Sequence, residues 1–297
     1  MIAIIGAGAW GTALAAVTRR AGHEVIIWAY EHQVAESINS DRENMLYLPG
    51  HKLELGIAAT TTLKNIVDAK AIFLAVPAQH LRKTIEPLRL LLPITTPLVV
   101  CSKGIEQGSL FLMSEVVSEL FPENPTMVLS GPTFAAETAA GLPTAITLAA
   151  IDIRAAEEVG RGIGSERFRP YSSADVIGTQ IGGAVKNVLA IACGIAEGRQ
   201  FGDNARAALI TRGLVELTRL CVAKGGRPET MMGLTGLGDL ALTCTSRQSR
   251  NYSLGIALGQ GNTLAEILKN RQSVAEGIYT ASAAAELAKK LAIEMPI

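Results

Sequence analysis

The chain has 297 residues, a length that accommodates one large domain or two smaller ones. Hydrophobic residues make up 48% of it, which is enough to bury a sizeable core. Lys plus Arg number 27, and so do Asp plus Glu, so the chain has no net positive charge to attract a polyanion. Aromatic residues, on which bases could stack, make up only 4%. We therefore expect no nucleic-acid partner, and any phosphate must be held by a local site.

The four cysteines lie in apolar or small-residue stretches and form neither a CxxC pair nor a metal-binding spacing with histidine. We expect buried free thiols, no metal and a reducing, cytoplasmic location. The apolar N-terminus has no basic residue before its apolar run, which argues against a secretory signal. No uncharged apolar run reaches the length that spans a bilayer, so stable membrane insertion is not expected. The cysteines are Cys101, Cys193, Cys221 and Cys244.

The first half of the chain alternates short β-branched runs with helical segments. The runs are almost continuously apolar, as is typical of strands buried on both faces. This alternation predicts an α/β domain with a doubly wound, Rossmann-type parallel sheet. The expected strands are Ile2–Ile5, Val25–Trp28, Ala71–Val76, Pro97–Cys101, Thr126–Leu129 and Thr144–Leu148, and the expected helices are Thr12–Ala21, Leu81–Leu91 and Leu110–Leu120.

The pattern changes after about Ser173. From Val176 onward no segment has the pattern of a strand, and helical segments are separated by glycine-rich breaks. We therefore predict a dinucleotide-binding domain over residues 1–175 and an all-α, substrate-binding domain over residues 176–297. The expected helices are Val176–Ala196, Ala205–Lys224, Tyr252–Leu258 and Ala281–Leu291.

A glycine-rich motif follows the first expected strand and opens the first expected helix. Its glycines are Gly6, Gly8 and Gly11, and the next strand completes a βαβ unit. In such a unit the first glycine permits a tight turn, the second lets the backbone approach a pyrophosphate, and the third lets the helix pack closely. The helix N-terminus supplies N–H donors to the phosphates. The alternative, a tight turn without a ligand, does not require three glycines in this register, so we predict a dinucleotide cofactor.

Lys186 is the only charged residue in the apolar segment Val176–Ala196. Gly182 and Gly183 lie four and three residues before it, so we expect them to leave a cleft beside the amine on the same helix face. Asn187 adds a polar group next to it. A desolvated lysine has its pKa drawn toward neutrality, which suits general acid–base chemistry. The alternative is a lysine that extends to the surface over a glycine-lined contact.

Two loop-like stretches follow expected parallel strands, at the sheet edge where α/β proteins bind ligands. One carries Lys103 and the other runs from Ser130 to Thr133. Lys103 is a candidate to meet an anion or a carbonyl group, and the alternative is a solvated loop lysine.

A later stretch holds Asp239, and the Ser249–Asn251 triplet follows it. Asp239 could orient a lysine or could only cap a helix. The triplet places Arg250, with its fork-shaped guanidinium, between two short polar side chains at an expected helix start. That arrangement is typical of an anion site, and the alternative is a surface charge.

Six stretches together resemble one family, the bacterial-type NAD(P)-dependent glycerol-3-phosphate dehydrogenases. The resemblance runs from Ile4 to Pro296. It implies reduction of dihydroxyacetone phosphate to glycerol 3-phosphate, or the reverse, with NAD or NADP, in support of phospholipid synthesis. The stretches, in chain order, are GAGAWGTALA, SKGIE, SGPTFAAE, GGAVKN, GLGDL and TSRQSRN.

The resemblance also implies roles for individual residues. Lys186 would be the proton donor and acceptor, Lys103 would touch substrate and cofactor, and Asp239 would organise the lysines. Gly131, Thr133, Ser249, Arg250 and Asn251 would help to hold the phosphorylated triose, with Lys103, Lys186 and Asp239 also in contact with it. Beside the three glycines and Lys103, the cofactor-contact positions would be Ala9, Trp10, Tyr30, Tyr47, Ala135, Arg250, Val274 and Glu276.

Two other functions stay open at this point. One is a related two-domain dehydrogenase of a hydroxy acid or a sugar acid, and the other is a regulator that binds a nucleotide without turnover. The oligomeric state is not determined by the sequence, and a homodimer is compatible with it.

The cofactor preference is also open, because the sequence gives competing signals. Many family members have an arginine or another polar base where the uncharged Tyr30 stands, whereas Glu31 lies at the spacing of an acid that binds ribose hydroxyls. We expect use of both cofactors. Because little chain follows the helix Ala281–Leu291, we also expect its C-terminal end to be less tightly packed and the helical domain to be incomplete there.

Overall fold

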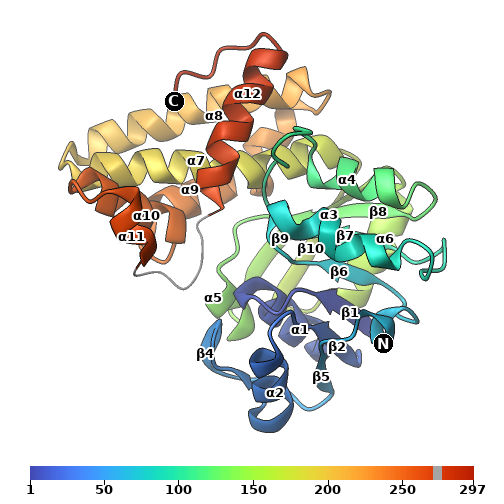
Figure 1. Ribbon diagram of the computed structural model, residues 1–297. Coiled ribbons are helices and arrows are strands. Elements are labelled where there is room, and N and C mark those ends of the chain that lie inside the picture. Colours follow the sequence, from blue (N-terminus) through green and yellow to red (C-terminus); the bar gives the residue numbers. More distant parts are fainter. Residues whose placement is uncertain (270–275) are drawn as a thin grey trace. The chain divides into compact units, whose positions relative to one another are not determined.

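The computed structural model describes residues 1–269 and 276–297, and its backbone divides into two units (Figure 1). Unit 1 comprises Met1–Ser102, Met113–Leu129 and Thr133–Val176. Unit 2 comprises the segment 103–112, the turn 130–132 and Ile177–Ile297. The sequence pattern predicts a single boundary near residue 175, which would put the segments 103–112 and 130–132 in the first domain. In the structure both segments belong to the helical unit. Lys103 and Gly131 therefore belong to unit 2.

Unit 1 is built on an eight-stranded sheet in the order β10-β9-β8-β7-β6-β1-β2-β5. Neighbouring strands from β5 to β8 pair in parallel, and so do β9 and β10. The six strands expected from apolar runs are all present, because strands buried on both faces need those runs. The strands are β1 (Ile2–Ile5), β2 (Val25–Trp28), β5 (Ile57–Thr60), β6 (Ile72–Leu74), β7 (Leu98–Val100), β8 (Thr126–Ser130), β9 (Thr144–Ala150) and β10 (Phe168–Ser173).

Helices flank this sheet, and buried residues of the sheet and the helices together form the core of unit 1. The expected helix Leu81–Leu91 is wrong in its second half, which is a 3₁₀ turn over Glu86–Leu88 that contains Pro87. The expected helix from Leu110 begins only at Met113. The helices are α1 (Ala9–Arg20), α2 (His32–Asp41), α3 (Leu81–Ile85), α4 (Met113–Leu120), α5 (Ala135–Ala139) and α6 (Ile153–Ile163), with further 3₁₀ turns over Leu63–Ile66 and Ala78–His80 and a hairpin of β3 (Glu43–Asn44) and β4 (Leu48–Lys52).

The strand order reverses around β1. The chain runs from β1 to β2 on one side and returns to β6 on the other, so β1 and β6 flank the switch point of the sheet. In open α/β sheets ligands bind outside the carboxyl ends of the strands at such a point. The glycine-rich turn follows β1 directly, so the topology places it where a dinucleotide is expected.

Unit 2 is helical, and no strand occurs among its described residues after Ile177. Its longest helix, α7, is long and apolar enough to cross a membrane by length and composition, but 72% of the relevant window is buried in the structure, as in a core helix. The elements are α7 (Val176–Gly198), α8 (Gly202–Ala223), a 3₁₀ turn (Pro228–Met232), a π-helical turn (Leu234–Gly238), α9 (Asp239–Thr245), α10 (Arg250–Gly259), α11 (Leu264–Lys269) and α12 (Gly277–Lys290).

The core of unit 2 joins α7, α8 and α12 and also takes in Ile105, Leu110 and Leu112 of the segment 103–112. Those three apolar side chains explain why the segment leaves the sheet domain. All four cysteines are buried and free, as expected. Beyond α12 the apolar residues Leu291, Ile293 and Met295 pack on the core but are only partly buried, so the end of the chain is covered less completely than α12.

Candidate functional site

The glycine-rich turn of unit 1 has the geometry that a pyrophosphate site requires. Gly6 has a φ of +111°, and a Cβ there would lie 2.7 Å from the backbone of Ala75, next to β6. A Cβ at Gly11 would lie 1.9 Å from the carbonyl oxygen of Gly6. A Cβ at Gly8 would meet nothing within 4 Å, so the open side of the turn is at Gly8. Gly8 is also the N-cap of α1 and no side chain caps this helix end, which leaves its N–H donors available to an anion.

Asn44, which the sequence analysis missed, braces this turn. Its Nδ2 donates to the carbonyl oxygen of Ala7 at 2.7 Å and to Thr12 Oγ1 at 2.8 Å, and its side chain is buried. Asn44 lies in the short hairpin after α2, where a lone asparagine gives no sequence signal. Ala9, Trp10 and Ala135, three of the expected cofactor positions, pack together against a small cluster formed by α1, β4 and α5.

The carboxylate at the end of β2 is held in place by a tyrosine. Tyr47 Oη donates to Glu31 Oε1 at 2.7 Å, and burial, followed by this bond to Glu31, raises the pKa of Tyr47 to about 12. Glu31 occupies the N-cap of α2 without capping it through its side chain, so its carboxylate is available to a ribose hydroxyl. Tyr30, beside it, is 82% exposed. Two of the expected cofactor positions thus flank a fixed acid.

In unit 2 the structure brings the three expected catalytic residues into one buried cluster. Asp239 is fully buried, and its Oδ2 lies 3.0 Å from Lys103 Nζ. Lys186 Nζ donates to the other carboxylate oxygen, Oδ1, and to Thr243 Oγ1 at 3.0 Å. The side chain of Lys186 is 7% exposed and that of Lys103 is 16% exposed. Lys186 therefore does not extend to the surface, Lys103 is not a solvated loop lysine, and Asp239 is more than a helix cap.

The cluster holds two lysines and one carboxylate, and this excess of positive charge affects the pKa of Lys186. Burial and the nearby charge of Lys103 lower the pKa of Lys186, the carboxylate of Asp239 opposes them, and the net result is a pKa of about 7. An ammonium with such a pKa exchanges its proton near neutral pH, as a general acid–base group must. Thr243 was missed by the sequence analysis, although its place four residues after Asp239 on α9 puts both side chains on one helix face.

The expected cleft beside Lys186 is wrong. A Cβ at Gly182 would lie 2.2 Å from the carbonyl oxygen of Thr235, and a Cβ at Gly183 would lie 2.4 Å from Ser130 Oγ. The two glycines therefore admit close neighbours to α7 and leave no open space of their own.

The Ser249–Asn251 triplet begins α10, as expected. Ser249 is the N-cap, and its Oγ accepts a hydrogen bond from the backbone N–H of Tyr252 at 3.2 Å. Asn251 is buried, and its Oδ1 accepts from the N–H of Gly277 at 3.1 Å, so it also fastens the start of α12. Arg250 is exposed on the first turn of α10.

The remaining expected residues are distributed between the units. Gly131 lies in the turn 130–132 of unit 2, and Thr133 begins a segment of unit 1. Glu276 is the N-cap of α12, and its carbonyl oxygen accepts from Thr280 Oγ1 at 3.0 Å. Val274 lies outside the described residues.

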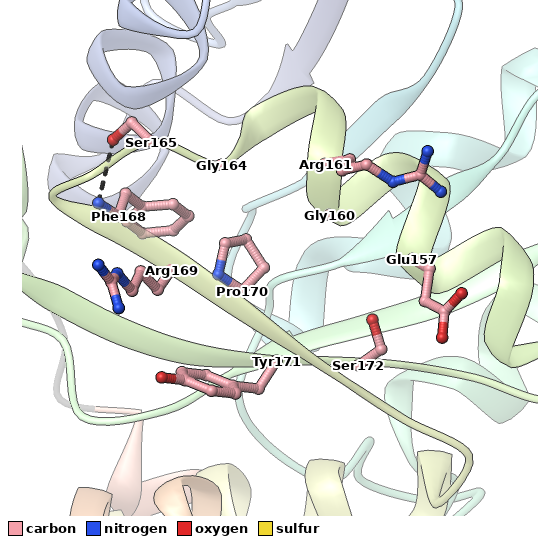
Figure 2. A pocket seen from close by; sticks show the side chains of 10 residues that line it. All are labelled: Glu157, Gly160, Arg161, Gly164, Ser165, Phe168, Arg169, Pro170, Tyr171 and Ser172. Atoms are coloured by element: carbon pink, nitrogen blue, oxygen red, sulfur yellow. Dashed lines mark hydrogen bonds between the residues drawn. The ribbon is translucent and has the colours of Figure 1, made fainter.

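A surface hollow of about 630 Å³ lies elsewhere on unit 1, between α6 and β10. Figure 2 shows its lining side chains, among them Glu157, Arg161 and Tyr171. None of the expected catalytic, cofactor or substrate residues lines it. We therefore assign the chemistry to the glycine-rich turn and the lysine–aspartate cluster and not to this hollow.

Comparison with known proteins agrees with both halves of this description. Residues 1–156 match the model of the NAD-dependent glycerol-3-phosphate dehydrogenase N-terminus, and residues 175–297 match that of the C-terminus. The chain is 57% identical over its whole length to glycerol-3-phosphate dehydrogenase [NAD(P)+] from Rhodospirillum rubrum and 54% identical to that from Parvibaculum lavamentivorans, and it spans 85% and 89% of those proteins.

A solved structure of a glycerol-3-phosphate dehydrogenase from Coxiella burnetii superposes with a TM-score of 0.95 at 42% identity, covering 99% of this chain and 91% of that one. Since the family models match both parts of the chain and the relatives match its full length, the chain belongs to the NAD(P)-dependent glycerol-3-phosphate dehydrogenase family.

Proposed function

We propose that this chain reduces dihydroxyacetone phosphate to sn-glycerol 3-phosphate with NADH or NADPH, and catalyses the reverse oxidation, with Lys186 as the general acid and base. The observation that carries the proposal is the buried cluster of Lys186, Asp239 and Lys103, together with the family that the chain belongs to. A titratable ammonium held by a fully buried carboxylate is the donor that an alkoxide needs when a ketone is reduced.

The reduction adds a hydride to the ketone carbon and a proton to its oxygen. The hydride would come from a reduced nicotinamide cofactor held on the glycine-rich turn. The ketone oxygen gains negative charge as its double bond to carbon breaks, and Lys186 Nζ donates the proton that neutralises it. Asp239 and Thr243 hold that Nζ in place, and the ammonium of Lys103 stabilises the developing charge. In the oxidation Lys186 accepts the hydroxyl proton instead.

Five residues would hold the rest of the substrate. Arg250 would pair with the phosphate from the start of α10, where the N–H groups of the helix also favour an anion. Ser249 and Asn251 would support it, and Gly131 and Thr133 would contact the triose.

The cofactor would lie on the glycine-rich turn, for which the open side at Gly8 and the uncapped N-terminus of α1 are suited. Ala9, Trp10, Tyr30, Tyr47 and Ala135 would line its path in unit 1. The family resemblance adds Lys103, Arg250, Val274 and Glu276 as further cofactor contacts.

We place the enzyme in the cytoplasm, where its product would serve phospholipid synthesis. Four buried free cysteines suit a reducing compartment. A homodimer is the assembly that we would test first, by light scattering coupled to size-exclusion chromatography.

An absorbance assay tests the activity directly. The purified chain is mixed with NADH or NADPH and then with dihydroxyacetone phosphate, a keto acid or a sugar acid. Loss of the reduced-nicotinamide absorbance with dihydroxyacetone phosphate supports the proposal. Loss only with a keto acid or sugar acid would replace it with a different dehydrogenase, and cofactor binding without turnover would indicate a nucleotide-binding regulator.

A further inference from the structure

Asp239 follows directly on a π-helical turn, Leu234–Gly238. Its backbone N–H donates to the carbonyl oxygen of Leu234, five residues earlier, so the turn fixes the position of the Asp239 backbone. Single π-helical turns are rare and occur frequently at functional sites. Within this turn Thr235 is 1% exposed, and its side chain bonds to residues outside the turn.

The hydroxyl of Thr235 joins three separate parts of the chain. Thr235 Oγ1 lies 2.5 Å from the carbonyl oxygen of Thr179 on α7 and 3.1 Å from Ser130 Oγ. A hydroxyl carries one proton, so Thr235 donates to the carbonyl and accepts from Ser130. Ser130 and Thr179 are also buried, so water does not compete for these bonds. One buried hydroxyl thus ties α7, the turn 130–132 and the segment that leads into Asp239.

The glycine pair on α7 makes this attachment possible. A Cβ at Gly182 would lie 2.2 Å from the carbonyl oxygen and 3.1 Å from the Oγ1 of Thr235. Backbone cannot yield to such a contact without moving the turn, whereas the contact of Gly183 is with the hydroxyl of Ser130. Gly182 lies four residues before Lys186, so the face of α7 that carries Lys186 is also the face that seats the turn of Asp239.

From these contacts we infer that Thr235, seated against Gly182, is a positioning residue that holds Asp239, and through it the ammonium of Lys186, in the geometry for proton transfer. Its hydroxyl bonds to Thr179 and Ser130, so it acts on the lysine through Asp239. The inference rests on the proposed function of Lys186. It matters because a displacement of about 1 Å in a catalytic group can cost on the order of 10²-fold in rate.

The pH dependence of turnover reports this positioning. The groups that face Lys186 Nζ are the charges of Asp239 and Lys103, the hydroxyl of Thr243 and the thiol of Cys244. Of the two charges, that of Asp239 opposes the loss of the proton from Lys186 and that of Lys103 favours it. If Asp239 moves away, the ammonium of Lys186 becomes a stronger acid, and the pH above which reduction slows must fall. A merely structural defect would leave that pH unchanged.

The test compares Thr235→Val, which keeps the shape and removes the hydroxyl, with Thr235→Ser, which keeps the hydroxyl. We expect kcat for reduction to fall about 10- to 100-fold in Thr235→Val, with its alkaline limb displaced to lower pH, and to return to within about 3-fold of the parent in Thr235→Ser. Thr218→Val, which removes a hydroxyl bonded to a carbonyl one turn back on α8, should change neither. Gly182→Ala should reproduce the Thr235→Val result and serves if that variant does not fold.

The inference would be overturned if Thr235→Val had the parent's kcat and the parent's pH profile. It would also be overturned if kcat fell while the alkaline limb of the pH profile stayed at the parent's pH. Lys186→Met is measured in parallel. If Lys186→Met retains activity, the proposed function itself fails. If Lys186→Met loses activity while Thr235→Val keeps the parent's kcat and pH profile, only the role of Thr235 is refuted.

Discussion

Replacing Asp239 by Asn removes one negative charge from the cluster and one of the two oxygens that accept from the lysines, with little change in side-chain shape. Each lysine contacts one oxygen of Asp239. At the 3.0 Å of the Lys103 contact, the Coulomb attraction is about 5.5 kcal/mol at an effective dielectric constant of about 20. That is an upper limit, because water and neighbouring dipoles relax around the changed charge. An opposite charge at such range typically shifts a pKa by about 1–3 units, and this is the shift we expect Lys186 to lose.

The pKa of Lys186 would then fall from about 7 to about 4–6. Near pH 7 the protonated fraction would drop from about one half to between about 9% and 0.1%, so the reduction would slow by about 5- to 500-fold through protonation alone. Since the reduction needs the protonated lysine, the alkaline limb of kcat moves to lower pH, and part of the activity returns on acidification.

Initial rates of NADH oxidation with saturating dihydroxyacetone phosphate, measured from about pH 5 to pH 9, test this. The matched control is Asp203→Asn, an acid on the surface of α8 whose side chain is 86% exposed. If the alkaline limb of kcat in Asp239→Asn stays at the parent's pH or moves to higher pH, the electrostatic role given to Asp239 is refuted.

Three further outcomes are expected. Lys186→Met should be more stable than the parent at pH 7, because folding of the parent must release the proton that Lys186 carries in the unfolded chain. Rising pH makes that release easier, so the difference in free energy of unfolding from urea titrations should shrink by up to about 1.4 kcal/mol per pH unit from pH 7 toward pH 10, and a constant difference would contradict this. Arg250→Ala should weaken use of dihydroxyacetone phosphate by about 1.5–3 kcal/mol in kcat/KM while sparing unphosphorylated dihydroxyacetone, and equal damage to both would exclude phosphate binding. NADH and NADPH should differ in kcat/KM by less than about 100-fold, and Glu31→Gln should favour NADPH relative to the parent; a larger preference in the parent would reveal a selective contact.

Strands and helices with strong apolar patterns were predictable from the sequence, and those with weak patterns were not. The central strands carry β-branched residues facing both ways. The edge strand β10 has alternating exposure and contains Pro170, and β5 at the other edge has mostly small residues, so neither has the run that marks a buried strand. The hairpin β3–β4 is largely polar, and Asn44 is recognisable only through its contacts with the glycine-rich turn.

The catalytic cluster could be proposed from the sequence only in part. A lone charge in an apolar helix singled out Lys186, but nothing in the spacing relates it to Lys103 or Asp239; the family motifs suggested that relation and the fold brings the three together. Gly182 and Gly183 show the limit of such reasoning. Absent side chains can leave space for a ligand or for a neighbouring segment, and only the coordinates place Thr235 and Ser130 there.

The most direct measurement of the central claim is kcat for dihydroxyacetone phosphate reduction by Lys186→Met, with Lys290→Met, an exposed lysine in the last turn of α12, as control. If Lys186 supplies the proton, its loss lowers kcat by about 10²- to 10⁴-fold while circular dichroism and cofactor affinity stay at the parent's values, and the control keeps full activity. A Lys186→Met enzyme with near-normal kcat would show that another group protonates the substrate.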